Sequence, residues 1–322
     1  MTIGFAFVAG LLAVLLVTGI LCLLYTWRTT RRIEAAMPPT GRFVAVPGAR
    51  LHVVERGQGP AVLLVHGLSG QLGHFGYGMV EPLARDFRVI AVDRPGAGYS
   101  TRETGAAADL PAQANALAAL IDTLGLDRPL VVGHSLGGAI ALALAIYHPE
   151  RVGGLALIAP LTHPPKEPSP VFKAMMVRAA WLRRLIAWTV AVPISMRRRE
   201  QVMDIVFGPD PVPDDYSTRA GGMLALRPSH FIAASEDFIG VAHSLPPLLG
   251  HYGTLRVPVS VLFGREDRIL DFAANGEALI AKVKGAKLTL VTGGHMLPVT
   301  AVDICVTFVR NAATQASELA SA

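Results

Sequence analysis

Residues 130–145 read LVVGHSLGGAIALALA. A short apolar run leads into a G-x-S-x-G pattern at 133–137, and small apolar residues typical of a buried helix follow. This order predicts a strand, a sharp turn that carries Ser135 in strained backbone geometry, and a helix. The glycines let helix and strand pack closely, and the N–H of Leu136 points to where negative charge develops on a substrate. We therefore interpret Ser135 as a nucleophile rather than as an ordinary turn serine.

The pattern around this stretch indicates an α/β protein. From Arg42 onward, continuous apolar runs alternate with helical periodicity. Strands that are apolar on both sides and alternate with helices predict a mostly parallel, doubly wound sheet covered on both faces. Strands are predicted at 51–55, 61–65, 88–92, 129–132, 155–158, 257–263 and 287–291, and helices at 110–124, 137–147, 273–283 and 299–311.

A serine hydroxyl becomes an effective nucleophile only when a base takes its proton. Of the ten histidines, His295 follows the strand predicted at 287–291 on a glycine loop that can aim its ring. The imidazole needs a carboxylate to fix its tautomer, and Asp267 follows the preceding predicted strand. Glu266 and Asp271 are neighbouring candidates that we interpret as solvated or helix-capping. The sequence thus predicts Ser135, Asp267 and His295 as a catalytic triad.

Four further motifs carry a family resemblance: HGL at 66–68, DRPGAGYS at 93–100, GRED at 264–267 and GGH at 293–295. Together with the serine motif, in this order, the chain from about Arg42 onward resembles the α/β-hydrolase superfamily. The resemblance implies an oxyanion hole built from the N–H groups of Leu68 and Leu136. It also implies that Asp93 is structural and that His66 shapes the oxyanion loop.

Several function classes are disfavoured. Haloalkane dehalogenases and epoxide hydrolases of this fold use Asp where Ser135 stands. No metal-ligand spacing or complete dinucleotide motif is present, so no metal or cofactor is predicted. Cys22 and Cys305 make no disulfide framework. The net charge of +5 comes without a nucleic-acid signature, and an anionic lipid surface is the preferred partner.

The N-terminus reads as a membrane anchor. Residues 3–24 carry no charge, which is enough to cross about 30 Å of hydrocarbon as a helix, and Tyr25, Trp27 and three arginines follow. A cleaved signal peptide is disfavoured because no basic segment precedes the apolar run. We expect a single-pass anchor at 1–27 and a linker at 28–41. The positive-inside rule places the catalytic domain in the cytoplasm.

A helical cap is predicted at 161–251, where strand signals are missing, between core segments 42–160 and 252–322. Its Met-, Trp- and Arg-rich stretch from Phe172 to Ile194 has two interpretations. One is cap packing with a solvated basic face, and the other is a surface that touches lipid and admits acyl chains.

These features predict a serine hydrolase that cleaves a carboxylic ester of a hydrophobic acid, or a lipid such as a monoacylglycerol, through an acyl-enzyme. Activity is expected to fall at low pH as His295 becomes protonated. The same triad and cap also serve carbon–carbon bond hydrolases, enol-lactonases, aminopeptidases and cofactor-free haloperoxidases. A non-catalytic membrane-bound scaffold is a further alternative. The acyl length and the oligomeric state stay open.

Overall fold

The computed structural model describes residues 2–165, 167 and 169–321. Four positions lie outside the described residues: Met1 of the predicted anchor, Lys166 and Pro168 of the predicted cap, and Ala322 at the end of the second core segment.

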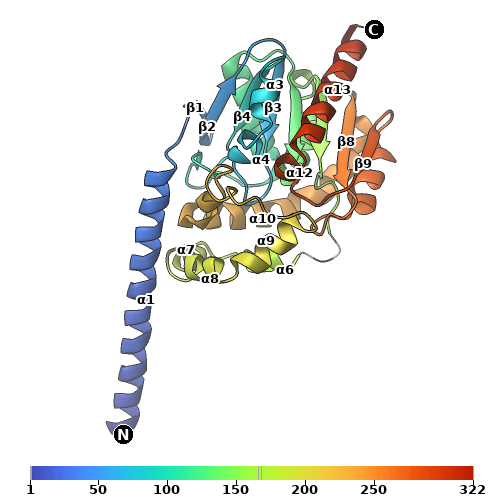
Figure 1. Ribbon diagram of the computed structural model, residues 1–322. Helices are drawn as coiled ribbons and strands as arrows, with labels where there is room; N and C mark the ends of the chain where they lie inside the picture. Colours follow the sequence, from blue (N-terminus) through green and yellow to red (C-terminus); the bar gives the residue numbers. More distant parts are fainter. Residues whose placement is uncertain (1, 166, 168, 322) are drawn as a thin grey trace.

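A nine-stranded sheet forms the centre of the body (Figure 1). Its order is β1-β2-β4-β3-β6-β7-β8-β9, with β5 beside β2. All pairs from β4 to β9 are parallel, whereas β2 pairs antiparallel with β1, β4 and β5. The predicted mostly parallel α/β sheet is confirmed. The strands are β1 (Arg42–Val46), β2 (Ala49–Arg56), β3 (Ala61–Val65), β4 (Arg88–Val92), β5 (Thr101–Arg102), β6 (Leu130–His134), β7 (Gly154–Ile158), β8 (Val259–Gly264) and β9 (Lys287–Val291).

Both faces of the sheet are buried, as the continuous apolar runs predict. In β3, Val62 and Leu64 belong to one core cluster, while Leu63 and Val65 belong to the other. Successive side chains of a strand point to opposite faces, so only a doubly covered sheet buries all four. Helices α4 and α5 cover one face, and α3 and α13 cover the other (Figure 1). Their bounds are α3 (Val80–Leu83), α4 (Leu110–Leu124), α5 (Leu136–Tyr147) and α13 (Val302–Ser321).

Some element predictions need correction. Strand β1 was not predicted, because it is covered on one side only and its residues alternate in burial. The helix predicted at 273–283 is a π-helical turn at Ala273–Glu277 followed by α11 (Ala278–Ile280). Gly276 packs against the sheet there, in a position where a helix-forming side chain has little room. The helix predicted at 299–311 is divided into α12 (Leu297–Thr300) and α13, which runs ten residues further.

Residues 161–251 contain helices and no strand among those that the structure describes. Helix α10 crosses below the sheet in Figure 1, and α6 to α9 lie below it on the side where α1 continues. The elements here are α6 (Pro170–Lys173), α7 (Ala180–Trp188), α8 (Ala191–Arg197), α9 (Arg199–Phe207), η2 (Gly222–Leu226), α10 (Pro228–Leu248) and η3 (Leu249–Thr254). Two short helical turns lie within residues 42–160, namely α2 (Gly73–Gly76) and η1 (Pro149–Arg151).

The N-terminal helix α1 runs from Thr2 to Ala36, a length of about 50 Å. The predicted linker at 28–41 is therefore helical over its first nine residues, which is a correction. Residues 28–36 contain no glycine or proline, and Pro38 and Pro39 follow where the helix has ended. One window of this helix is long and apolar enough to cross a membrane, with a mean hydropathy of 2.8, and none of that window is buried.

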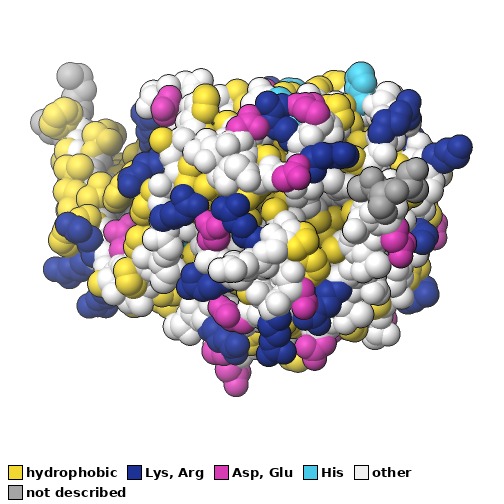
Figure 2. Space-filling model, turned by 90° about the horizontal axis from the view of Figure 1, so that it is seen from above, with side chains coloured by type: hydrophobic (Ala, Val, Ile, Leu, Met, Phe, Trp, Pro, Cys, Tyr) yellow, Lys and Arg dark blue, Asp and Glu magenta, His cyan; other side chains and the backbone are white. Residues whose placement is uncertain are grey.

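The last third of α1 packs against the body, although its first part stands free. Thr26 and Ile33 are buried, and the Thr26 hydroxyl donates to the carbonyl of Thr189 between α7 and α8. Near the end of the helix, Glu34 lies 3.7 Å from Arg227. Figure 2 shows the body from above, where acidic and basic side chains are interspersed and the apolar α1 stands at one edge.

Candidate active site

Ser135 occupies the turn between β6 and α5. Its backbone has φ +55° and ψ −120°, a conformation that costs energy for a residue with a side chain and is concentrated at functional sites. Hydrogen bonds hold it on both sides: its N–H donates to Ile158, and its carbonyl accepts from Leu161 and Gly138. The strained turn is therefore fixed by β7 and the segment after it.

Close backbone approach explains the glycines around this serine. A Cβ on Gly137 would lie 2.0 Å from the carbonyl oxygen of Val65, and one on Gly133 would lie 2.5 Å from the oxygen of Gly137. A Cβ on Gly67 would lie 2.8 Å from the Cβ of Ser135. The loop after β3 thus runs directly beside the serine, and only glycine fits there.

His295 and Asp267 are held together as the sequence predicts. The Nδ1 of His295 lies 2.7 Å from Oδ2 of Asp267, and both side chains are almost fully buried. The second carboxylate oxygen of Asp267 accepts the N–H groups of Ile269 and Leu270 at 2.8 and 2.9 Å. The carboxylate is therefore fixed by three hydrogen bonds. Within the described residues no hydrogen bond reaches Nε2 of His295, from Ser135 or from another side chain.

Two acidic residues position the loop that carries His295. Glu266, interpreted from sequence as solvated or helix-capping, accepts the N–H of Gly293 at 2.7 Å. Asp210, from the 161–251 region, accepts the N–H of Gly294 at 2.9 Å and the hydroxyl of Thr300 at 3.1 Å. Sequence reasoning missed the role of Asp210, because its contact spans 84 positions. The only local signal was an acidic residue between two prolines.

The loop after β3 is held by a buried arginine. Arg94 donates to the carbonyls of His66 and Gly67 at 2.9 Å, and its N–H donates to Nε2 of His66. His66 in turn bonds the Gly67 carbonyl through Nδ1 at 2.9 Å. These bonds orient the backbone next to Leu68, whose N–H is one of the two predicted oxyanion donors.

Asp237 on α10 balances the charge of Arg94. The two side chains are each 1% exposed and are 2.6 Å apart. Arg102 also binds Asp237, and it reaches Glu236 at 3.0 Å. Glu236 also forms an ion pair with Arg183 of α7, whose guanidinium lies 2.8 Å from the Glu236 carboxylate. A network of charges thus joins the loop beside Ser135 to the helices of the 161–251 region.

Asp93 has the structural position that the family resemblance implies. It is 1% exposed and accepts the N–H groups of Leu72 and Tyr99 at 2.7 and 2.8 Å. Its third partner is Nδ1 of His52 at 2.8 Å. A Cβ on Gly98 would overlap the Asp93 carboxylate, which explains the glycine at that position.

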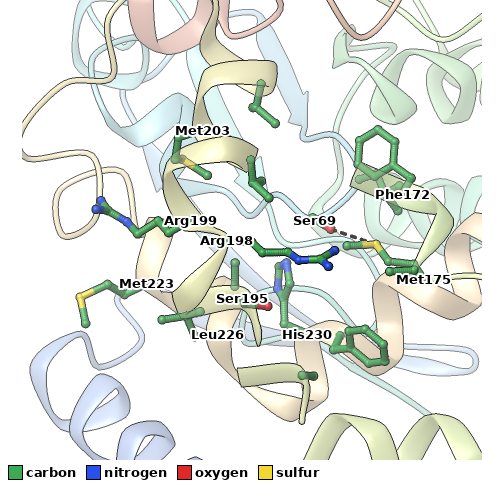
Figure 3. A pocket seen from close by; sticks show the side chains of 18 of the residues that line it. Ser69, Phe172, Met175, Ser195, Arg198, Arg199, Met203, Met223, Leu226 and His230 are labelled. Carbon is green, nitrogen blue, oxygen red and sulfur yellow. Dashed lines mark hydrogen bonds between the residues drawn. The ribbon is translucent and has the colours of Figure 1, made fainter. Parts of the chain in front are cut away.

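Ser135 and His295 open into a single pocket of about 580 Å³. Leu68 lies on its wall, while the side chain of Leu136 is buried in the core and leaves only its backbone N–H at the turn. Most of the lining is apolar and comes from α6 to α9 and η2. Figure 3 shows Phe172 and Met175 on one side of this space and Met203, Met223 and Leu226 on the other.

Four buried histidines surround this region in the neutral form. Burial lowers the pKa of His74 and of His230 to about 4, and neighbouring charges add to the effect. Burial also holds the pKa of His66 and His134 well below its usual range. His134 donates from Nε2 to the carbonyl of His295 at 3.0 Å. His66, His74 and His134 therefore act as fixed hydrogen-bonding groups rather than as charges near neutral pH.

The histidines outside the predicted triad differ in exposure. His74 and His230 line the pocket, and His243 and His251 are exposed. Among the described residues, no group of three or more His, Cys, Asp or Glu side chains has the geometry to hold a metal ion.

Comparisons with known proteins identify the family. A family model for the alpha/beta hydrolase fold matches residues 60–302. The chain belongs to this family. Its sequence is 32% identical over 232 residues to the 2-hydroxy-6-oxononadienedioate/2-hydroxy-6-oxononatrienedioate hydrolase of Paraburkholderia phymatum, covering 69% of this chain and 76% of that protein. The protein is accordingly a hydrolase.

Two other similar proteins match very different shares of this chain. A dihydrolipoyllysine-residue acetyltransferase component of an acetoin cleaving system, from Cupriavidus necator, is 36% identical over 121 residues. That match covers 37% of this chain and only 32% of the relative's length. The solved structure of a membrane phospholipase A, a bacterial virulence factor, superposes with a TM-score of 0.68 at 25% identity. It covers 97% of this chain and 100% of its own, so the likeness extends into α1.

Proposed function

We propose that this α/β hydrolase is a membrane-anchored serine esterase that cleaves carboxylic esters of hydrophobic acids. In this proposal Ser135 attacks the ester carbonyl, and His295 takes the hydroxyl proton and passes it to the leaving alcohol. Asp267 holds the imidazole in the required tautomer. The N–H groups of Leu68 and Leu136 stabilise the oxyanion. Water then releases the acid from Ser135.

The observation that carries the proposal is the strained turn of Ser135 beside a buried His295–Asp267 pair in one apolar pocket. Strain at a non-glycine residue persists only where surrounding contacts enforce it, and here β7 and the glycine loop do so. The apolar walls favour a long hydrocarbon group over a charged one. An acyl chain bound by these walls would place its carbonyl near Ser135.

We further propose that residues 1–27 anchor the enzyme in a membrane and that the 161–251 cap touches its surface. Thr26 contacts Thr189 between α7 and α8, directly after the free apolar part of α1. Those two helices therefore lie at the level where the apolar segment ends. They expose large apolar side chains at the same level: Trp181 is 70%, Leu185 53% and Ile194 48% exposed.

The same helices border the pocket on their inner side. Ile186, Val192 and Met196 line it, while Arg197 and Arg198 are exposed nearby and match an anionic lipid surface. An acyl chain could thus pass from the bilayer to Ser135 without crossing water. The full-length likeness to a membrane phospholipase A supports this arrangement.

Three further assignments belong to the proposal. Residues 42–160 and 252–322 would form the hydrolase core, with 161–251 as the cap. The arginines after the anchor favour a cytoplasmic domain. Protease added outside sealed cells is expected to leave the domain intact, and its digestion would place it on the outer side.

Ester hydrolysis is tested with p-nitrophenyl esters of increasing acyl length and the full chain in detergent. We expect kcat/KM to rise from acetate to at least octanoate and activity to vanish in Ser135→Ala. Cys22→Ala is the control, since it removes the thiol of α1 and should retain full activity. No turnover of any ester by folded wild-type protein would contradict the proposal.

A second candidate reaction is carbon–carbon bond hydrolysis of a 2-hydroxy-6-oxo-dienoate. The similarity to the hydrolase from Paraburkholderia phymatum favours it. Such acids carry a charge, and Arg198 offers a cation at the pocket. Decay of the dienoate absorbance, with kcat/KM above that for octanoate ester, would select this reaction instead.

A further inference from the structure

One side chain in the pocket lacks the partners that every buried polar group needs. His230, the third residue of α10, is 4% exposed and lines the pocket. The Ser69 backbone interacts with the ring and opposes the fall in its pKa, yet neither ring nitrogen makes a hydrogen bond of normal geometry in the part of the chain that the structure describes. An unpartnered buried group in a cavity is a group that a ligand can satisfy.

Ser69 adds a second available group at the same place. Its hydroxyl is directed at the sulfur of Met175 at 3.8 Å, a weak acceptor that a ligand oxygen would replace (Figure 3). Ser69 has φ +52° and sits in the loop beside the nucleophile, two residues after Gly67. The pair His230 and Ser69 therefore borders the space next to the predicted oxyanion donor Leu68.

The chemistry of the two groups selects what they can bind. Burial, with Arg227 and Arg94 nearby, lowers the pKa of His230 to about 4, so the ring offers one N–H donor and one bare nitrogen acceptor. A hydroxyl group can bind at either ring nitrogen, because it can both donate and accept a hydrogen bond. A carboxylate can bind only at the N–H and an ammonium group only at the bare nitrogen, so each suits one ring nitrogen where a hydroxyl suits either.

We infer that His230 and Ser69 form a polar subsite that binds a free hydroxyl group of the ester substrate. This inference rests on the proposed esterase function and deepens it by naming the substrate class. The substrate would be a hydroxyl-bearing ester with one long apolar chain. The hydroxyl can belong to the alcohol part, as in a monoacylglycerol, or to the acid, as in a hydroxyacyl ester.

Kinetics on matched esters test the subsite and locate the hydroxyl. Glyceryl monodecanoate is compared with propyl decanoate, and methyl 3-hydroxydecanoate with methyl decanoate. We expect at least a tenfold higher kcat/KM for the hydroxylated member of one pair, as one well-placed hydrogen-bonding group gives. The pair that shows the preference tells which part of the substrate carries the hydroxyl.

Variants assign the preference to this residue. His230→Leu is expected to abolish the preference, measured as the ratio of the two kcat/KM values within a pair, and His230→Asn is expected to restore part of it. His243→Leu is the control, because His243 is an exposed histidine on the same helix. A wild type without preference in either pair, or an equal loss on both esters in His230→Leu, would overturn the inference.

Binding separates this inference from the proposed reaction. The Ser135→Ala full-length protein in detergent is titrated with 1-decyl glyceryl ether and with decyl propyl ether, neither of which can be hydrolysed. Tighter binding of the glyceryl ether by about tenfold, lost in Ser135→Ala/His230→Leu, supports the subsite even if no ester is cleaved. Equal binding of the two ethers, with no hydroxyl preference in either ester pair, overturns it. Tighter binding of decyl phosphate than of the glyceryl ether also overturns it and points to Arg198.

Discussion

The loops at the ends of the strands and the helices of the 161–251 region face each other across one pocket. The polar side chains on the two sides differ in how fully they are hydrogen-bonded. On the sheet side, Asp267 accepts three hydrogen bonds and Arg94 is bound on every side by carbonyls and carboxylates. On the helical side, Asp237 and Asp210 are paired, but His230 makes no hydrogen bond within the described residues and Trp181 is exposed to solvent.

This contrast indicates a division of labour. Groups that must act on a developing charge are pre-organised on rigid strands, where reorganisation costs little at the moment of reaction. The helices keep their unsatisfied and apolar groups for contacts that the isolated chain does not make. The first side would define the reaction, and the second would define the substrate and its location.

The largest effect is expected at the carboxylate that orients His295. Asp267→Asn keeps the volume but removes the charge and favours the wrong imidazole tautomer, so kcat should fall by about 10³–10⁴-fold. The melting temperature reports whether the fold survives, and Asp271→Asn, a cap of the neighbouring turn, is the control. A decrease below tenfold would mean that Asp267 does not orient the base.

The second-largest effect is expected in the charge network around Arg94. Two neighbouring acidic residues on α10 differ in burial and can be compared directly. Asp237 is 1% exposed and Glu236 is 32% exposed. Asp237→Asn leaves Arg94 buried without a counter-charge and should cost about 3–5 kcal/mol of unfolding free energy, whereas Glu236→Gln should cost about 1 kcal/mol or less. Chemical denaturation measures both. Equal effects would show that the network does not depend on burial.

The neutral histidines predict a loss of stability in acid. Because the folded pKa of His74 is about 4, the unfolded chain, with a histidine pKa of about 6.5, binds the proton first as the pH falls. Stability is therefore complete above pH 6.5 and declines towards pH 4, by up to about 1.4 kcal/mol per pH unit for each such ring. His74→Gln should flatten the decline in melting temperature between pH 7 and 5. An unchanged slope would contradict a depressed pKa.

The smallest effect is expected on the apolar outer face of the cap. In proteoliposomes, Trp181→Ser/Trp188→Ser should lower hydrolysis of a bilayer-embedded ester by about three- to tenfold, the range expected from losing partly buried aromatic area. Hydrolysis of a soluble butyrate ester should not change.

A matched control separates membrane contact from general surface effects. Ile304 is 43% exposed on α13, a helix that runs toward the end of the body away from the free end of α1 (Figure 1). Ile304→Ser should alter neither substrate. An equal loss on soluble and embedded substrates in the tryptophan variant would argue for a folding defect instead.

Sequence patterns predicted the parts of the molecule that depend on local signals. The buried strands, the glycine-framed turn of Ser135 and the Asp267 and His295 loops each have a signature within a few residues. The hydrogen bond between His295 and Asp267 follows from where their loops leave neighbouring parallel strands.

The parts that escaped prediction depend on distant contacts. Asp210 reaches the His295 loop across 84 positions, and Asp237 reaches Arg94 across 143. Neither has a local motif, because a carboxylate on a helix or in a loop gives the same sequence signal whether it is solvated or paired in the core. The packing of α1 has a related cause: the helix contacts α7, α8 and η2, and Thr26 and Ile33 are buried, which the linear sequence does not reveal.

The central claim is that Ser135 is activated by His295, and labelling with a fluorophosphonate tests it most directly. The purified full-length protein in detergent is treated with the probe beside Ser135→Ala and His295→Ala, with His243→Ala as the control. We expect one labelled site in the wild type and in His243→Ala, and no labelling in the other two variants. Folded wild-type protein that does not react, or Ser135→Ala that still does, would contradict the account.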